Sequence, residues 1–531
     1  MAEEGPVVFT RRASGLVREV GAFTAMSIGL THTIGGGINK LMVLMRYENP
    51  GASEFGAFGI AGLIVILTAV AYTMLAVSMP RTGGDYIYIS RAIHPVLGFL
   101  TSWAFYFTEI LSLGVIAYYD TDYWALGFNI YGSATENATM YDWSDTLTNN
   151  DSVRLAVALS IVVVAALVTY LGTRVYSYII NIGLFLGVIG SIVMGVYFLA
   201  HLSGDTAQLW NETYGPGTYE AIHTKAVDLG VETASFSVGA TIDASIAAVW
   251  AYIGFTAAAY MGGEVKNPSR SLIWAMVGGS IVIIAYYLFL SLMVANTFGD
   301  FMADYAYMYF DQKETLLEIM PHAPAAILPT YACALAPGQT VLQLIMALSA
   351  AIWLLNDIPA FFLVCSRLVF SWSFDRFFPE KLADVNDRFH SPHYAILLTA
   401  IGGFVGVLLC AAGEYQAAME TTVGFLFAIT FGTAAAAITP YVRKDLYERS
   451  IKLEVAGVPV MTIFGLLAFG CNFFLLFVAG SGLWTGDSGL LNLGLVAIWE
   501  FIGLLIFVAY YKHNIDRGVD VDTIYAEIPP A

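Results

Sequence analysis

Apolar residues in this chain are gathered in long runs, and short polar segments separate them. Twelve of the runs are about as long as the 20 residues that an α-helix needs to cross a bilayer. The predicted spans are 22–45, 56–79, 95–119, 154–172, 177–200, 240–262, 271–296, 340–371, 394–412, 422–440, 457–480 and 489–511. The pattern therefore predicts an all-α polytopic membrane protein with twelve transmembrane helices.

Two of these spans contain residues that weaken a helix near mid-membrane. In the first, the glycines 35–37 lie between His32 and Lys40, and each glycine costs roughly 1 kcal/mol in a helix relative to alanine. In the sixth span, 240–262, Gly254 lies near the centre. Unwound backbone is tolerated in a membrane only where it lines a polar cavity, and half-helix ends attract ions of opposite sign. The paired breaks predict an inverted-repeat transporter with its substrate between them, although close packing of small residues would also explain the first glycine run.

Composition and charge agree with a membrane protein. The chain has 531 residues, of which 58% are hydrophobic and 12% are charged, about half the charged fraction of a soluble domain. Most of the 23 Lys and Arg residues fall on the loops that share a side with the N-terminus, so we expect both termini to be cytoplasmic. The acidic excess, which gives a net charge of −18, falls mainly on the predicted outer loops. An acidic outer face concentrates cations, or it simply keeps the loops soluble.

The sequence offers little support for catalysis. The four cysteines form no CxxC pair, and no nucleophile–base set or metal-ligand spacing is evident. We therefore expect a protein that is not an enzyme, with no cofactor, no metal and no nucleic-acid partner.

Five short motifs resemble those of one transporter superfamily. Residues 34–38 (IGGGI) resemble its GSGIF element, and residues 80–86 (PRTGGDY) its PRSGGEY loop. Residues 264–268 (EVKNP) match the element after helix six, 366–376 resemble the segment after helix eight, and 390–392 (HSP) precede helix nine. In this order the motifs make nearly the whole chain similar to the amino acid–polyamine–organocation transporter superfamily.

The resemblance implies a fold of two inverted five-helix repeats followed by two further helices, with alternating access to a central site. The expected segments are a cytoplasmic tail (1–20), the first repeat (21–200), an extracellular loop (201–239), the second repeat (240–440), helices eleven and twelve (441–511) and a second cytoplasmic tail (512–531).

The resemblance also implies which residues bind the substrate. Backbone amides at 35–37 would bind a carboxylate, and the carbonyls of Ile253 and Gly254 an ammonium group. Tyr252 or Phe255 would cover the site. The family usually has an acidic residue where this chain has Thr256, which weakens any scheme that needs a carboxylate there. The expected substrate-binding residues are Thr33, Ile34, Gly35, Gly36, Gly37, Ile38, Thr108, Glu109, Tyr252, Ile253, Gly254, Phe255 and Thr256.

Ionisable residues inside a span are functional candidates by default. Glu109 would bind a substrate ammonium, carry a coupled proton, or pair with Lys40 inside the protein. Asp357 would help to bind sodium with the nearby oxygen donors Ser349 and Asn356, or it is a satisfied polar group beside Pro359. The expected ion-coupling residues are Glu109, Ser349, Asn356, Asp357 and Lys40.

Two further positions bear on coupling. His32 is either neutral and hydrogen-bonded or protonated near the ordinary pKa of about 6.5. Some proton-coupled members of the superfamily carry a lysine on helix five, but the matching position here is Gly187, which argues against that mechanism.

These features predict a secondary active transporter for amino acids or related organic amines in the cell membrane. It would be proton- or sodium-coupled, or an exchanger. The alternatives are a transporter-like amino acid sensor, whose usual signalling domain has no room in such short tails, and a polyamine transporter. An ion channel is disfavoured because broken helices favour occlusion. The expected partners are a small-molecule substrate, H⁺ or Na⁺, and the lipid bilayer.

Overall fold

The structure is a computed structural model that describes residues 14–202, 204–231, 234–413, 422–485 and 489–529. Residues 1–13, which form most of the expected N-terminal tail, lie outside the described residues.

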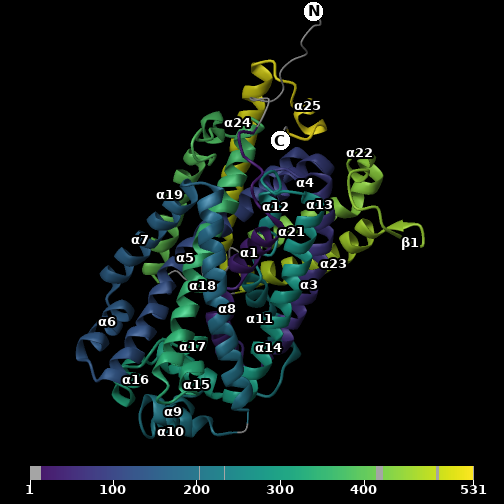
Figure 1. The fold of residues 1–531 in the computed structure, drawn as a ribbon. Coiled ribbons are helices and arrows are strands. Elements are labelled where there is room, and N and C mark those ends of the chain that lie inside the picture. The colour runs from purple at the N-terminus through teal and green to yellow at the C-terminus, as the bar shows by residue number, and fades with distance from the viewer. Residues whose placement is uncertain (1–13, 203, 232–233, 414–421, 486–488, 530–531) are drawn as a thin grey trace, which may run out of the picture.

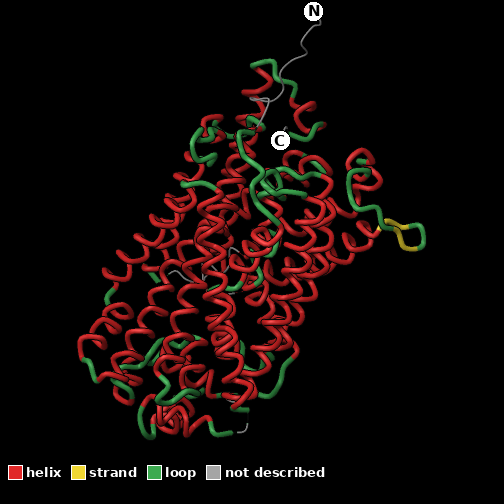
Figure 2. Tube along the Cα trace, viewed as in Figure 1, coloured by secondary structure: helices red, strands yellow, loops and turns green. Residues whose placement is uncertain are grey.

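Long apolar helices dominate the fold. Within the described residues, 10 helical segments are long and apolar enough to cross a membrane. They are α3 (Glu54–Ser78), α5 (Pro95–Thr135), α7 (Asp151–Tyr170), α8 (Thr173–Ala200), Pro268–Phe298 (α13, Pro268–Leu272; η2, Ile273–Gly278; α14, Gly279–Phe298), α18 (Thr340–Phe374), α19 (His393–Ala411), α21 (Thr422–Val442), α23 (Val460–Thr485) and α24 (Gly489–Asp516). The only strands in the described residues are β1 (Glu454–Val455) and β2 (Val458–Pro459), which pair in an antiparallel hairpin (Figure 2). The protein is thus an all-α polytopic membrane protein, as predicted.

The first and sixth predicted spans are interrupted helices. The first consists of α1 (Ala22–Thr33), the π-helical η1 (Gly37–Leu41) and α2 (Met42–Glu48). The sixth consists of α11 (Val238–Ala251) and the short α12 (Ala257–Tyr260).

Several helices begin where a polar side chain caps the first turn. Ser53 accepts a hydrogen bond from the Gly56 amide before α3, Asn150 from the Val153 amide before α7, and Ser237 from the Ala240 amide before α11. Such caps satisfy amides that the helix itself leaves unpaired.

A stripe of large apolar side chains on the outside of α8 marks a lipid-facing surface. The exposed members recur every three or four residues: Tyr178, Ile182, Phe185, Ile189, Ile192, Val196 and Leu199. That spacing places them on one face of the helix. An apolar surface of this extent is expected to contact hydrocarbon.

The expected loops contain helices that the span pattern did not predict. The helix predicted at 95–119 continues to Thr135 as α5, because most residues of 120–130 are buried against neighbouring elements. The additional helices are α6 (Ala138–Asn149), α9 (Thr206–Tyr214), α10 (Thr218–Asp228), α15 (Phe301–Phe310), α16 (Lys313–Ile319) and α17 (Leu328–Ala334). Elsewhere the chain forms α4 (Asp85–Ala92), η3 (Glu380–Ala383), α22 (Lys444–Tyr447) and α25 (Val521–Ala526).

The long helices run side by side along the length of the molecule, with α5 and α18 packed against each other near the centre (Figure 1). We call the end that carries α4, α22 and α25 the tail end, and the opposite end, with α9, α10, α15 and α16, the loop-helix end (Figure 1). At the tail end, α25 contacts α4, and the Tyr525 hydroxyl lies 3.2 Å from that of Tyr86.

Candidate substrate and ion site

The first break leaves backbone groups outside any helix. At Ile34 the backbone turns away from helical geometry (φ −84°, ψ 86°), and helical structure resumes before Gly37. The second break covers 252–256, where Gly254 has a φ of +110°. L-residues rarely adopt that conformation, so glycine is required there.

The two breaks lie in direct backbone contact. A Cβ atom added to Gly254 would lie 2.4 Å from the carbonyl oxygen of His32, and one added to Gly37 would lie 2.4 Å from the Cα of Ala251. Glycines at these positions therefore allow the two interrupted helices to approach each other closely.

A tyrosine on α14 connects the two breaks. The Tyr287 hydroxyl lies 2.6 Å from the carbonyl oxygen of Thr33 and 2.9 Å from that of Ala251, the last residues of α1 and α11. Its side chain is fully buried. These two carbonyls lie at helix ends that lack the usual intrahelical partner, and the single hydrogen of the hydroxyl can be donated to either.

His32 lies between two carboxylates from different helices. Its Nδ1 is 2.8 Å from Asp357 Oδ1 on α18, and its Nε2 is 3.2 Å from Glu109 Oε2 on α5. All three side chains are buried, and the imidazole ring meets the Phe361 ring edge-on at 4.4 Å. We call His32, Glu109 and Asp357 the buried triad. Glu109 Oε1 has no hydrogen-bond partner among the described residues.

A small cavity of about 10 Å³ lies beside the breaks and the buried triad. Gly36, Gly37, Ser112, Trp250 and Phe361 are among its walls. A space of this size holds about one water molecule, so the site is closed around its own side chains in this conformation. The Trp250 indole donates to Ser112 Oγ at 3.2 Å, which connects α11 to α5.

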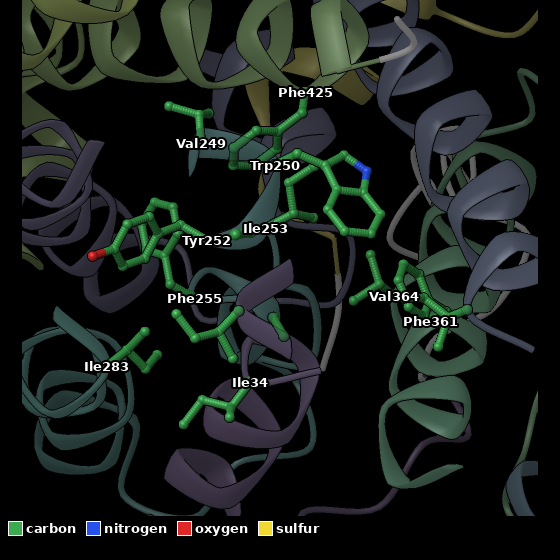
Figure 3. Close-up of a cluster of buried hydrophobic side chains, with 14 of the residues drawn as sticks. Ile34, Val249, Trp250, Tyr252, Ile253, Phe255, Ile283, Phe361, Val364 and Phe425 are labelled. Atoms are coloured by element: carbon green, nitrogen blue, oxygen red, sulfur yellow. The ribbon is translucent and has the colours of Figure 1, made fainter. Parts of the chain in front are cut away.

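Tyr252 and Trp250 project on opposite sides of the second break (Figure 3). The Tyr252 hydroxyl donates to the carbonyl of Phe58 on α3 at 3.3 Å, so of the two aromatic covers expected from sequence Tyr252 faces away from the cavity. Phe255 packs against Phe425 on α21.

The other expected substrate residues are all buried around the breaks. Thr33, Ile34, Ile38 and Ile253 belong to the interrupted segments, and the cavity wall includes Thr33 and Ile253. The Thr108 hydroxyl donates to the Ala104 carbonyl within α5, at 3.4 Å. Thr256 Oγ1 is buried and has no hydrogen-bond partner in the part of the chain that is described.

Sequence reasoning did not identify Ser112, Ile116, Trp250, Phe361 or Tyr287. Helical periodicity would have found three of them. Ser112 and Ile116 follow Glu109 by three and seven residues, and Phe361 follows Asp357 by four, so each shares a helix face with its acid. Tyr287 is on a separate span, and no local pattern connects it with the breaks.

Ser349 and Asn356 face α8. The Asn356 amide donates to the Ile180 carbonyl at 3.0 Å, and Ser349 packs where α8 has Gly190. A Cβ at Gly187 would lie 2.5 Å from the Trp353 ring, so α8 has no room for a lysine there. Neither Ser349 nor Asn356 appears among the walls of the central cavity.

The expected pairing of Lys40 with Glu109 is wrong. Lys40 Nζ lies 3.7 Å from Asp122 Oδ2 and 2.9 Å from the centre of the Tyr119 ring, both on α5 toward the loop-helix end. Arg154 on α7 binds the other oxygen of Asp122 at 2.8 Å. Lys40 lies one helical turn beyond Gly36, and η1 carries it away from Glu109, which takes His32 as its partner.

Ion pairs connect several elements at the tail end. Arg367 on α18 binds Glu264 through two nitrogens, both at 2.9 Å, and Thr173 donates to the same carboxylate at 2.7 Å. Arg91 on α4 lies 2.6 Å from Asp375.

A hydrogen bond from a tyrosine joins α4 to the end of the second interrupted helix. The Tyr260 hydroxyl hydrogen-bonds Asp85 at the start of α4. Burial raises the pKa of the Asp85 carboxyl to about 6, although the hydrogen bond from Tyr260 acts in the opposite direction.

A cavity of about 670 Å³ lies away from the breaks, at the loop-helix end. Its walls include Arg46, Glu54, Asp300, Asp304 and Tyr307. Burial raises the pKa of Asp304, against the opposing effect of a hydrogen bond from His223. We place the candidate site at the breaks and not in this cavity, because the unwound backbone and the buried triad are found at the breaks.

Comparison with known proteins identifies the family of the chain. A family model described as amino acid permease matches residues 20–499. The methylthioribose transporter of Bacillus subtilis is 22% identical over 513 residues, which cover 95% of this chain and 96% of that protein. The branched-chain amino acid permease BcaP of the same organism is 22% identical, and 96% of each chain is covered. The serine/threonine exchanger SteT, also of Bacillus subtilis, is 24% identical, and the match covers 52% of this chain and 55% of SteT.

Proposed function

Because the chain belongs to the amino acid permease family and is a membrane transporter, not an enzyme, we propose that it carries an amino acid or a related small organic molecule across the cell membrane. Transport would proceed by alternating access to the cavity between the two breaks. The observation that carries this proposal is the direct contact of two interrupted helices, whose end carbonyls both meet the Tyr287 hydroxyl. Interrupted helices at a shared midpoint are the usual site of secondary transporters.

The proposed architecture has twelve membrane crossings, ten by the long helices and two by the interrupted ones. Residues 21–200 and 240–440 would form two inverted repeats, joined by the outer segment 201–239 and followed by two helices within 441–511. The tail end would be cytoplasmic, with both termini, 1–20 and 512–531, on that side.

In the proposed binding mode, a substrate carboxylate accepts hydrogen bonds from the amides of the first break, at Gly35, Gly36 and Gly37. Its ammonium group binds the carbonyls of Ile253 and Gly254. Trp250 and Phe361 then form the apolar walls that face the side chain of the substrate, a role supported by their position at the cavity. The cavity of about 10 Å³ must widen to admit any amino acid.

The names of the relatives cover hydroxyl-bearing and branched-chain amino acids and a thiosugar, so the substrate has to be found by measurement. The test is uptake by purified protein in liposomes with labelled L-serine, L-leucine, L-arginine, putrescine and methylthioribose. Each compound is tried with a pH gradient, with a sodium gradient, and with internal substrate only.

We expect at least one amino acid to accumulate above the level in protein-free liposomes. Movement that requires internal substrate would identify an exchanger. Accumulation of putrescine alone would identify a polyamine transporter. Binding without movement of any compound would contradict transport and favour a sensor.

A further inference from the structure

The buried triad joins three helices around one imidazole. His32 is on α1, next to the first break, whereas Glu109 and Asp357 are on α5 and α18, which pack extensively against each other. Alternating access requires the interrupted helix to move relative to such neighbours. The contacts of His32 therefore lie across a boundary that changes during transport.

The two hydrogen bonds of His32 fix how many protons the triad holds. Both ring nitrogens lie against carboxylate oxygens, so each contact needs one proton. The histidine is either an imidazolium between two carboxylates or a neutral ring with one protonated acid. Both arrangements leave one net negative charge in a buried place, where an uncompensated charge is costly. One additional proton makes the triad neutral.

The structure shows an acceptor for that proton. Glu109 Oε1 is buried and has no hydrogen-bond partner among the described residues, although the other oxygen of the same carboxylate is bound to His32. Protonation would make Glu109 neutral without breaking the contact between Asp357 and His32, because that contact uses the other ring nitrogen.

The triad also lies where it interacts directly with a bound substrate. A Cβ at Gly35 would be 2.7 Å from Asp357 Oδ2, so this carboxylate lies against the bare backbone of the first break. A substrate carboxylate bound to the amides at 35–37 would place a second negative charge beside the triad. The repulsion is relieved when the triad takes up a proton, and by reciprocity the proton then strengthens substrate binding.

Neighbouring titratable groups do not neutralise the triad. Described residues that interact electrostatically with Glu109 or Asp357 include Asp85 on α4, Tyr260 on α12, Cys365 on α18, Tyr176 on α8 and Tyr287 on α14. None of these carries a positive charge. The nearby Arg367 is bound to Glu264. The triad suits a proton better than a sodium ion, because His32 already binds one oxygen of each acid. The other expected oxygen donors, Ser349 and Asn356, face α8.

We propose that the His32–Glu109–Asp357 triad is a proton-binding site coupled to the substrate, so that a proton enters with each substrate molecule. The proposal rests on the proposed transport function. His32 and Asp357 act as positioning residues in this scheme, and Glu109 is the proton acceptor.

The test measures proton and substrate flux in the same liposomes. The liposomes contain the pH dye pyranine, and the compound from the uptake panel that the wild type carries is added outside. We expect the interior to acidify as substrate enters. In Glu109→Gln and His32→Gln the acidification that accompanies substrate entry should be lost, because the proton acceptor or the residue that positions it is missing. The matched control is His201→Gln, which removes a histidine–aspartate contact outside the long spans.

A purely structural role for the triad would lower both fluxes together and leave their ratio unchanged, which would overturn the proposal. Substrate entry by the wild type without acidification would overturn it as well, while leaving the transport function intact. Failure of every panel compound to move or bind would instead refute both.

Variants that carry too little substrate for a flux ratio are tested by binding. Titration calorimetry of the same compound in phosphate and in Tris buffer reports the protons taken up on binding. We expect uptake by the wild type and by His201→Gln, and a loss of that uptake in Glu109→Gln. Equal proton uptake by Glu109→Gln and the wild type would refute the assignment.

Discussion

Gly36 and Gly37 are adjacent in the first break, but a side chain at each would meet a different kind of neighbour. A Cβ at Gly36 would lie 2.5 Å from Ile116 Cδ1, the flexible end of a side chain. A Cβ at Gly37 would lie 2.4 Å from the Cα and 2.5 Å from the Cβ of Ala251. The first clash can be relieved by a rotamer change, and the second only by separating the two interrupted helices.

The contrast sets the expected sizes. Overpacking of a closed site costs about 1–3 kcal/mol where side chains can adjust. We therefore expect Gly36→Ala to weaken substrate binding about 5- to 150-fold. The free-energy cost of Gly37→Ala should exceed about 3 kcal/mol, because the backbone must move. This variant should therefore reduce uptake more than about 100-fold.

A second substitution separates the two cases. Ile116→Val removes only Cδ1, so the double variant Gly36→Ala/Ile116→Val should recover most of the lost binding. The same valine should give no recovery with Gly37→Ala. Gly470→Ala on α23 is the control, since a Cβ there meets nothing within 4 Å.

The assay is binding and uptake of one labelled substrate by each purified variant, after size-exclusion chromatography has shown equal folding. Equal activity of Gly37→Ala and Gly36→Ala would refute the reasoning. So would a failure of Ile116→Val to rescue Gly36→Ala.

Three further predictions concern closure and pH. Arg367→Gln should destabilise the protein by about 3–5 kcal/mol, because it leaves Glu264 buried without its charged partner. In thermal unfolding in detergent, adding Glu264→Gln to this variant should restore part of the lost stability. No restoration would contradict the pairing. The folded-state pKa of Asp85, about 6, is above its ordinary value of 3.8, so the stability of the protein should fall as pH rises from about 4 through about 6. Asp85→Asn should flatten the plot of stability against pH in this range. Parallel plots for the variant and the wild type would contradict this prediction. Tyr287→Phe should slow transport, because the buried Ala251 carbonyl loses its hydroxyl donor at a cost of about 1–3 kcal/mol, while the Thr33 carbonyl keeps the Gly35 amide at 3.1 Å. Tyr252→Phe, which loses one longer bond of 3.3 Å, is the milder control.

The sequence was sufficient to predict the membrane class and the positions of both breaks. Apolar run length and consecutive glycines are local properties, and both depend directly on the cost of exposing backbone in lipid. The helices within 120–153, 201–239 and 297–339 were missed because their apolar residues pack against the protein and form no run of membrane length.

The candidate site was only partly predictable for a similar reason. Glu109 and Asp357 were identified as charges inside spans, but the side chain that joins them, His32, was identified only as a separate residue. Lys40 was placed with the wrong acid, because its partner Asp122 lies beyond the predicted end of span three. Pairing across helices depends on packing, which no local pattern in the sequence reveals.

The hydroxyl of Tyr287 has one hydrogen but two carbonyls within reach. When one interrupted helix swings away, the hydrogen can turn to the carbonyl of the other, and the hydroxyl still makes one bond. Opening toward either side of the membrane would then break no net hydrogen bond at this point. Tyr287 would thus favour neither open state over the other. The binding of a substrate or a proton could then determine which of the two is populated.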